Sequence, residues 1–222
     1  MKIPISARLL ACCDYVNQND RIADVGCDHG YLSIHLLRSG IARSAIASDV
    51  NEQPLMSAVR NAEKFGVREK MEFYLSDGVG NVPRNFDAMV CAGMGGDTMI
   101  SILKAAPWLK DGKYRLVLQC QSKTPGLRKY LSENGWHIRR ENLVKDGKFL
   151  YPVMDVAWEP AEPLTSAQCY LTPALRESGS PLFEEYRERI LRGLRLTVSG
   201  LARCADPRLK EYQNILKELE ER

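Results

Sequence analysis

The sequence lacks paired cysteines, long apolar runs and a strong net charge, and each absence argues against a class of protein. Its seven cysteines are odd in number and scattered, with no C-x-x-C pair. We therefore expect neither a disulfide framework nor a metal site, and we expect a reducing, cytoplasmic compartment. No apolar run approaches the roughly 18 residues of a membrane-spanning helix, and no basic and then apolar leader opens the chain. We expect no membrane partner.

The net charge of +3 is too small to indicate a nucleic-acid-binding protein by itself, so any basic surface must be local. The content of 45% apolar and 27% charged residues is that of a globular protein. A length of 222 residues suffices for one α/β domain with a small appendage. We expect a monomer or a weak dimer.

The most informative stretch is RIADVGCDHGY, residues 21–31. It predicts a short apolar strand that breaks at Gly26 and enters a helix after Gly30, a turn that presents backbone N–H groups and the positive end of a helix. Asp24 and Asp28 bring two carboxylates to this turn. Carboxylates repel a pyrophosphate and attract an ammonium or sulfonium group, so the stretch favours an S-adenosylmethionine-type ligand over NAD. The alternative is a tight turn without a ligand.

Two further acidic residues follow predicted strands. The strand at 44–48 ends at Asp49, about 20 residues after the glycine turn, the spacing from which an acid reaches ribose hydroxyls. Asp49 can otherwise cap the next helix. The strand at 71–76 ends in Asp77-Gly78, which either reaches an adenine amino group or forms an ordinary Asp-Gly turn.

A fourth strand, Phe86 to Cys91, is almost continuously apolar and runs into the segment AGMGGD, residues 92–97. Its glycines remove side chains at the end of the strand and leave room for a bulky planar group. Enzymes that methylate exocyclic amino groups of bases usually carry an Asp/Asn-Pro-Pro-aromatic motif at this point, and this segment has none.

The order of these elements predicts an α/β fold. We expect a helix over residues 5–19, five strand–helix units, and then two β-rich runs on either side of Asp146-Gly147, which is a hairpin signal. This is the Rossmann-like seven-stranded sheet of class I methyltransferases with its antiparallel C-terminal β-hairpin. Nicotinamide dehydrogenases have an all-parallel sheet instead.

The composition changes at the sequence EPAEP, residues 159–163, which reads as a stiff linker. We expect two domains, a cofactor-binding domain over 1–158 and a coiled-coil-like helical hairpin over 164–222, with helices at 181–204 and 207–222. Arginines crowd the first of these helices, but 161–222 holds ten basic and ten acidic residues. A solvated, ion-paired helix is the usual interpretation, and a tRNA-binding appendage is the functional one.

Several motifs together resemble one family over essentially the whole chain. They are SxRL (6–9), DVGCDHGYL (24–32), Asp77-Gly78, AGMGG (92–96), LVLQ (116–119) and the C-terminal helical hairpin. They are similar to those of TrmK, the bacterial tRNA (adenine-N1)-methyltransferases that act at tRNA position 22. The chain departs from that family at Gln119-Cys120-Gln121, where members often have Gln-Pro-Asn, and at Asp49, where many have Glu.

The resemblance implies methyl transfer from S-adenosylmethionine to adenine N1 in tRNA. That nitrogen has a free lone pair, so the reaction needs alignment more than deprotonation, and the base must be unpaired or flipped out. A carboxylate near the cationic product ring would stabilise it, and we take Asp28 and Asp97 as catalytic candidates, with His29 orienting the cofactor or the base. The expected cofactor-binding residues are Asp24, Gly26, Cys27, Asp28, His29, Gly30, Tyr31, Asp49, Asp77, Gly78, Ala92, Gly93 and Met94.

Two other functions stay open at this point, a small-molecule methyltransferase on the same fold and a non-catalytic RNA-binding module. The expected partner is tRNA. The basic candidates for contact with RNA, besides the arginines of the C-terminal helices, are Lys123, Arg128, Lys129, Arg139, Arg140, Lys145 and Lys148.

Overall fold

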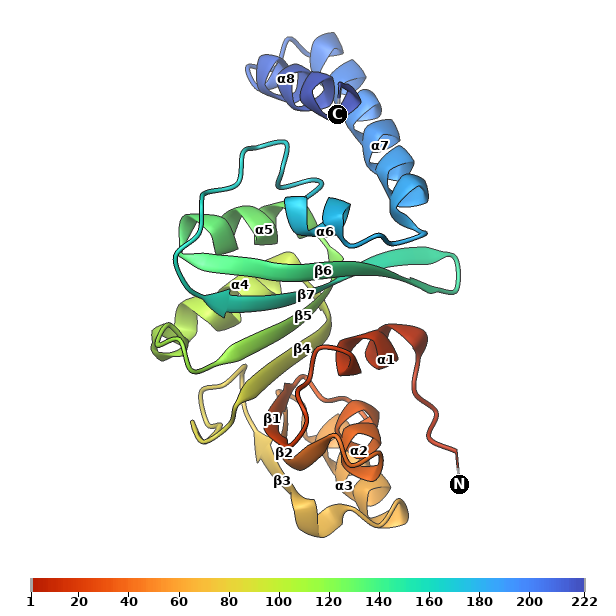
Figure 1. Cartoon of the computed structure of the whole chain (residues 1–222), viewed down its shortest axis with the longest axis vertical. Helices are drawn as coiled ribbons and strands as arrows, with labels where there is room; N and C mark the ends of the chain where they lie inside the picture. The colour runs from red at the N-terminus through yellow and green to blue at the C-terminus, as the bar shows by residue number, and fades with distance from the viewer. Residues whose placement is uncertain (1, 222) are drawn as a thin grey trace.

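The computed structural model describes residues 2–221 and is built around one seven-stranded sheet (Figure 1). The strand order is β3-β2-β1-β4-β5-β7-β6, with β1 to β5 parallel and β7 antiparallel to both of its neighbours. The strands are β1 (Asp20–Val25), β2 (Ala42–Asp49), β3 (Met71–Leu75), β4 (Ala88–Gly95), β5 (Arg115–Ser122), β6 (Trp136–Asp146) and β7 (Phe149–Trp158). The predicted sheet with its antiparallel hairpin is confirmed.

Helices cover both faces of the sheet. They are α1 (Ala7–Cys13), α2 (Tyr31–Arg38), α3 (Glu52–Lys64), α4 (Gly96–Ala105), α5 (Thr124–Glu133), α6 (Pro173–Glu177), α7 (Phe183–Arg203) and α8 (Leu209–Glu220), with single 3-10 turns η1 (Arg68–Lys70) and η2 (Pro107–Leu109). No helix within residues 2–221 is long and apolar enough to cross a bilayer.

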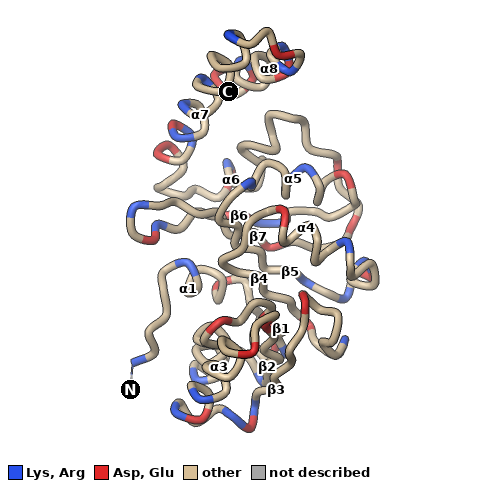
Figure 2. Tube along the Cα trace, turned by 180° about the vertical axis from the view of Figure 1, so that it is seen from behind, with Lys and Arg blue, Asp and Glu red and all other residues tan. Residues whose placement is uncertain are grey.

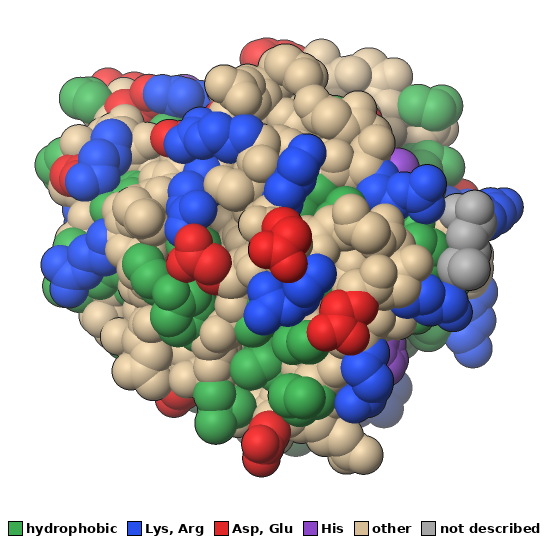
Figure 3. All heavy atoms as spheres, turned by 90° about the horizontal axis from the view of Figure 1, so that it is seen from below, with side chains coloured by type: hydrophobic (Ala, Val, Ile, Leu, Met, Phe, Trp, Pro, Cys, Tyr) green, Lys and Arg blue, Asp and Glu red, His purple; other side chains and the backbone are tan. Residues whose placement is uncertain are grey.

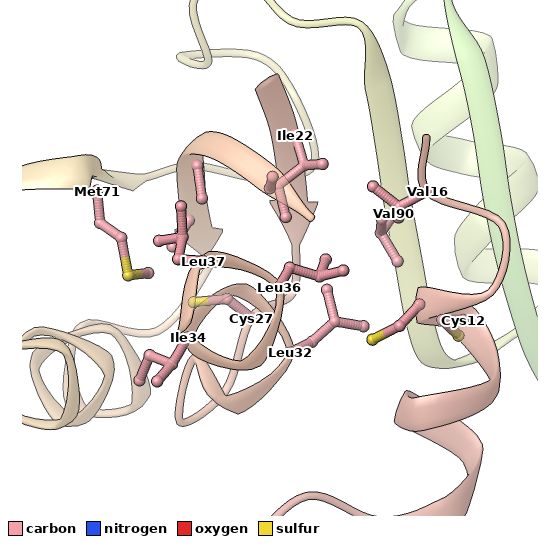
Figure 4. Packing of buried hydrophobic residues seen from close by; sticks show 14 of the residues in the cluster. Cys12, Val16, Ile22, Cys27, Leu32, Ile34, Leu36, Leu37, Met71 and Val90 are labelled. Carbon is pink, nitrogen blue, oxygen red and sulfur yellow. The ribbon is translucent and has the colours of Figure 1, made fainter. Parts of the chain in front are cut away.

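The central strands are buried on both faces, which explains their continuous apolar character. On one face Ile22 of β1 packs with Leu32 and Leu36 of α2 and with Cys12 of α1 (Figure 4). On the other face Ala23 and its strand neighbours pack against α4 and α5. The two cores hold the carboxyl ends of β1, β2 and β4 at one edge of the sheet, where the loops with the predicted site residues begin.

The first helix is shorter than its apolar spacing predicts. The pattern over 5–19 predicts one helix, but α1 ends at Cys13. Asn19 has a φ of 68°, and the Asp20 carboxylate accepts a hydrogen bond from the Asn17 N–H at 2.9 Å. A left-handed residue and a side-chain-closed turn are incompatible with a continuing helix. The chain therefore turns into β1 and leaves α1 free to lie across the edge of the sheet.

A buried ion pair fixes the segment that follows the sheet. Arg128 of α5 and Glu141 of β6 are fully buried, and the guanidinium donates to Glu141 Oε1 at 2.6 and 3.1 Å. Arg128 also donates to the carbonyls of Cys169 and Tyr170, and Thr172 donates to the second carboxylate oxygen. The expectation that Arg128 faces RNA is wrong, because no part of its side chain reaches solvent. It pins residues 169–172 to the edge strand.

The helical hairpin shares its core with the β-hairpin. Leu191 and Leu194 of α7 and Ile215 of α8 belong to one buried cluster with Leu143 of β6 and Leu150 of β7. In Figure 1 the first turns of α7 lie near the tip of the β6–β7 hairpin, and α8 lies alongside α7. The predicted linker at 159–163 is therefore not the only connection between the two predicted domains, and the division itself stays a prediction.

We expect Arg128→Leu to lower the free energy of unfolding by about 3–5 kcal/mol, because Glu141 would keep a buried charge without its partner. Urea denaturation followed by circular dichroism measures this. Lys129→Leu is the matched control, since the next residue of the same helix is exposed and makes only a long ion pair with Glu133. Equal effects of the two substitutions would contradict the structural role of the buried pair.

Candidate active site at the carboxyl edge of the sheet

The turn after β1 depends on glycine. Gly26 and Gly30 have φ values of 73° and 70°, in the left-handed region that side chains disfavour. The Gly26 and Cys27 N–H groups donate to the Ser48 carbonyl of β2 at 2.8 and 2.9 Å. A Cβ on Gly26 would stand 2.1 Å from Met94 Cε. The turn thus lies directly against the glycine segment at the end of β4.

Asp24 is buried beneath this turn. Its Oδ2 accepts a hydrogen bond from Ser33 Oγ at 2.7 Å, which ties the end of β1 to the first turns of α2. Burial raises the pKa of Asp24 to about 6, although the hydrogen bonds from Ser33 oppose that shift. Burial destabilises the charged form of this carboxylate, and carboxylates with such raised pKa values are typical of functional sites.

The Asp49 carboxylate closes the turn before α3 and contacts the glycine turn, and its contact with ribose hydroxyls stays a prediction. Its Oδ1 accepts from the Asn51 N–H at 2.9 Å at the start of α3, and its Oδ2 accepts from the Asp28 N–H at 3.2 Å. The same carboxylate therefore holds the segment that leads into α3 and the glycine turn. Asp28 itself has a φ of 51°, an uncommon value for a residue with a side chain.

Two exposed apolar residues flank Asp49. Val50 follows it and is 61% exposed, and Leu75 pairs with it across β2 and β3 and is 52% exposed. We did not predict a role for either residue from the sequence. The available signal was an apolar residue within two positions of a strand-end acid, Asp49 or Asp77. Together they offer an apolar surface at the carboxyl ends of the strands, suited to the face of a planar base.

Asp77-Gly78 forms the turn expected after β3. The Asp77 carbonyl accepts from the Gly80 N–H at 3.2 Å, and its side chain is exposed. Gly78 has a φ of 54°, and a Cβ there would approach Ile102 Cγ1 to 3.0 Å. The ordinary turn is therefore present, and an adenine contact by Asp77 stays a prediction.

Arg8 of α1 lies against the glycine gap of β4. A Cβ on Gly93, which has a φ of 81°, would be 2.7 Å from the Arg8 guanidinium. Gln119 Oε1 accepts from the Gly93 N–H at 3.0 Å and from Arg8 at 3.2 Å, and Arg8 Nε lies 3.6 Å from Asp146 Oδ2. The sequence showed Arg8 only as part of a family motif, because nothing local reveals its reach to β4, β5 and β6.

The three catalytic candidates are solvent-accessible. Asp28 and His29 are exposed neighbours, with 3.6 Å between carboxylate and imidazole, and the His29 ring lies 5.7 Å from that of Tyr31. Asp97 begins α4 and pairs with Lys123. Since Lys123 counters the charge of Asp97, Asp28 is the stronger candidate for stabilising a developing cation. No group of three or more His, Cys, Asp or Glu within residues 2–221 is arranged to hold a metal.

Comparisons with known proteins agree with this geometry. The family described as "Methyltransferase domain" matches residues 5–154. The Bacillus subtilis tRNA (adenine(22)-N(1))-methyltransferase is 26% identical over 229 residues, which cover 100% of this chain and 94% of the relative. A candidate tRNA methyltransferase of Mycoplasma genitalium is 35% identical over 136 residues, and this match spans 60% of each protein.

Solved structures agree as well. The B. subtilis m1A22 tRNA methyltransferase TrmK superposes with a TM-score of 0.87 at 26% identity, covering 98% of this chain and 99% of that one. A candidate tRNA (m1A22) methyltransferase of Streptococcus pneumoniae, in complex with S-adenosyl-L-methionine, gives 0.84 at 28% identity and covers 97% of this chain and 99% of that one.

The raised pKa of Asp24 predicts a pH dependence of stability. Its neutral form stabilises the fold fully below the ordinary pKa of 3.8, and this contribution is lost as the pH rises through about 6. Asp24→Asn cannot ionise and keeps an acceptor for Ser33. Relative to wild type, its free energy of unfolding should rise by about 2 kcal/mol between about pH 4 and pH 8.

Urea denaturation across this pH range measures the difference between the two proteins. Asp77→Asn controls for the loss of one carboxylate at an exposed position. Parallel stability curves for wild type and Asp24→Asn would contradict the assignment.

Proposed function

The chain belongs to the TrmK family of class I S-adenosylmethionine-dependent methyltransferases, and we propose that it methylates N1 of adenine 22 in tRNA. The observation that carries the proposal is the glycine-lined edge of the sheet, with Asp28 after β1, Asp49 at the end of β2 and Asp77 after β3. The similarity to m1A22 tRNA methyltransferases over 97–100% of the chain supports it.

The residues at this edge fit S-adenosylmethionine. The turn at residues 26–30 has glycine at both ends, where no side chain blocks the approach of a ligand, and Asp49 has carboxylate oxygens at the end of β2 for ribose hydroxyls. Val50 and Leu75 suit one face of the adenine, with Asp77 beside them. Ala92, Gly93 and Met94 form the opposite wall. When bound, the cofactor supplies an electrophilic methyl group on a sulfonium.

The chain itself has to align the acceptor and stabilise the charge that develops on it. Adenine N1 attacks with its own lone pair, so no general base is required. We place the base at the opening beside Gly93, where the Arg8 guanidinium lies against the backbone. The exposed Asp28 has a carboxylate at this opening, where the ring becomes cationic. His29 can orient Asp28 or the cofactor from the same turn. Asp97, paired with Lys123, has a smaller part.

Contact with tRNA has to come from local groups of cations. Figure 3 shows that the centre of the face seen from below mixes Lys and Arg with Asp and Glu. Arg195 of α7 is held by Glu220 at 2.7 and 3.0 Å, and Arg189 by Glu185. Arg192, between them in sequence, makes no hydrogen bond or ion pair with any residue in 2–221. The helical hairpin is the proposed tRNA-binding appendage, and Arg192 is an exposed cation on its first helix.

The test is methyl transfer from labelled S-adenosylmethionine to unmodified tRNA, followed by nucleoside analysis. The expected product is 1-methyladenosine. Asp49→Ala should weaken cofactor binding about tenfold or more, because the ribose would lose hydrogen bonds to a charged group. Isothermal titration calorimetry measures this, with the exposed Glu52→Ala as the control at the start of α3. Transfer to a small molecule but not to tRNA would contradict the proposed substrate.

Charge reversal at Arg192 tests the appendage. Arg192→Glu should weaken tRNA binding several-fold, lower the salt dependence of log K by about one unit per contact, and leave cofactor affinity unchanged. Lys70→Glu, an exposed cation beside the edge strand β3, is the control. Arg195→Glu is a poorer probe, because it also breaks the pair with Glu220. Equal tRNA affinity for Arg192→Glu and wild type in low salt would rule out this contact.

A further inference from the structure

The tip of the β6–β7 hairpin presents an aromatic ring to solvent. Phe149, the first residue of β7, is 51% exposed. Its ring centroid lies 5.9 Å from that of Tyr151, and Lys148 Nζ lies 5.4 Å from the Phe149 centroid. Figures 1 and 2 show this tip extending past the rest of the sheet, at the end where α1 lies. Neither the core nor the proposed cofactor site uses the ring.

The tip is joined to the acceptor gap by a short chain of contacts. Phe149 pairs across the hairpin with Asp146. Asp146 forms the ion pair with Arg8, whose guanidinium lies against Gly93. One cross-strand pair and one side chain therefore separate the exposed ring from the place proposed for the target adenine. The ring is therefore linked to Gly93 through Asp146 and Arg8.

The tip is also held in place. Arg189 of α7 donates from both terminal nitrogens to the Lys148 carbonyl at 3.2 Å, and Lys145 pairs with Glu185 at 3.0 Å. Leu150, the next residue, is buried in the cluster shared with α7. The ring thus stands on a fixed support. A preorganised aromatic surface loses little conformational entropy when a ligand stacks on it.

The surroundings favour RNA as the ligand. The cations Lys145, Lys148, Arg8 and Arg189 outnumber the two carboxylates, Asp146 and Glu185, that pair with them. An aromatic ring among cations binds single-stranded nucleic acid, because every base has a face that stacks and every nucleotide has a phosphate. Extruding an adenine from a stacked strand leaves the face of its neighbour uncovered.

We propose that Phe149 stacks on the base of a nucleotide adjacent to the methylated adenine, with Lys148 close to the neighbouring phosphate. The ring would replace the stacking contact that the neighbour loses when the adenine is extruded. This inference rests on the proposed function, since it needs a tRNA substrate.

The test measures kcat/KM and Kd for unmodified tRNA with Phe149→Ala, Phe149→Leu and Phe149→Trp. Loss of stacking should weaken tRNA binding about tenfold in Phe149→Ala. Phe149→Leu keeps an apolar side chain without an aromatic face and should resemble Phe149→Ala, whereas Phe149→Trp should retain wild-type affinity. Trp158→Ala removes another exposed aromatic, at the opposite end of β7, and should have no effect on tRNA. Cofactor affinity, measured for each variant, checks that the fold is intact.

A second set of tRNAs identifies the stacked base. Substrates that lack the base on the 5′ or the 3′ side of adenine 22 should bind wild type more weakly, and with one of them Phe149→Ala should have no additional effect. Phe149→Ala that behaves as Trp158→Ala would overturn the proposal, as would an undiminished effect with both abasic tRNAs. If wild type transfers no methyl group to tRNA, the proposed function is wrong. If wild type is active but Phe149→Ala has no effect, only the stacking proposal is wrong.

Discussion

The site depends on a close approach between the turn after β1 and the glycine segment at the end of β4. A Cβ on Gly26 would stand 2.1 Å from Cε of Met94 in β4, and a Cβ on Gly93 of β4 would reach the Arg8 guanidinium of α1. Both glycines also have left-handed backbone that side chains disfavour. The strand-end acids and the glycine segment lie at one opening because Gly26 leaves space for the Met94 side chain and Gly93 leaves space for the Arg8 guanidinium.

The position of the C-terminal helices depends on buried contacts with the β6–β7 hairpin. The buried pair of Arg128 and Glu141 fixes the returning chain on the edge strand, and the cluster around Leu150 and Leu191 joins the helical hairpin to the β6–β7 tip. The proposed tRNA-binding helices and the tip next to the acceptor gap are therefore parts of one packed unit. An RNA bound along α7 would therefore contact a helix whose position relative to the β6–β7 tip is fixed before binding.

Much of this was predictable from the sequence, since local patterns determine it. Alternating and continuous apolar runs identified all seven strands, and the acids Asp49 and Asp77 stood at strand ends as expected. The predictions that failed concern residues whose partners are distant in the sequence. Arg128 looked like any surface cation until the fold placed Glu141 against it, and Arg8 reaches partners more than 80 residues away in sequence. The early end of α1 depends on a side-chain-closed turn that apolar spacing does not reveal.

The most direct measurement maps the methylated nucleotide. A methyl group on N1 blocks the Watson–Crick edge, so reverse transcription of tRNA treated with the protein and S-adenosylmethionine stops at the modified base. The account predicts one new stop, at adenine 22, that disappears when this adenine is replaced by guanine. A stop at another position, or methyl transfer that produces no stop, would contradict it.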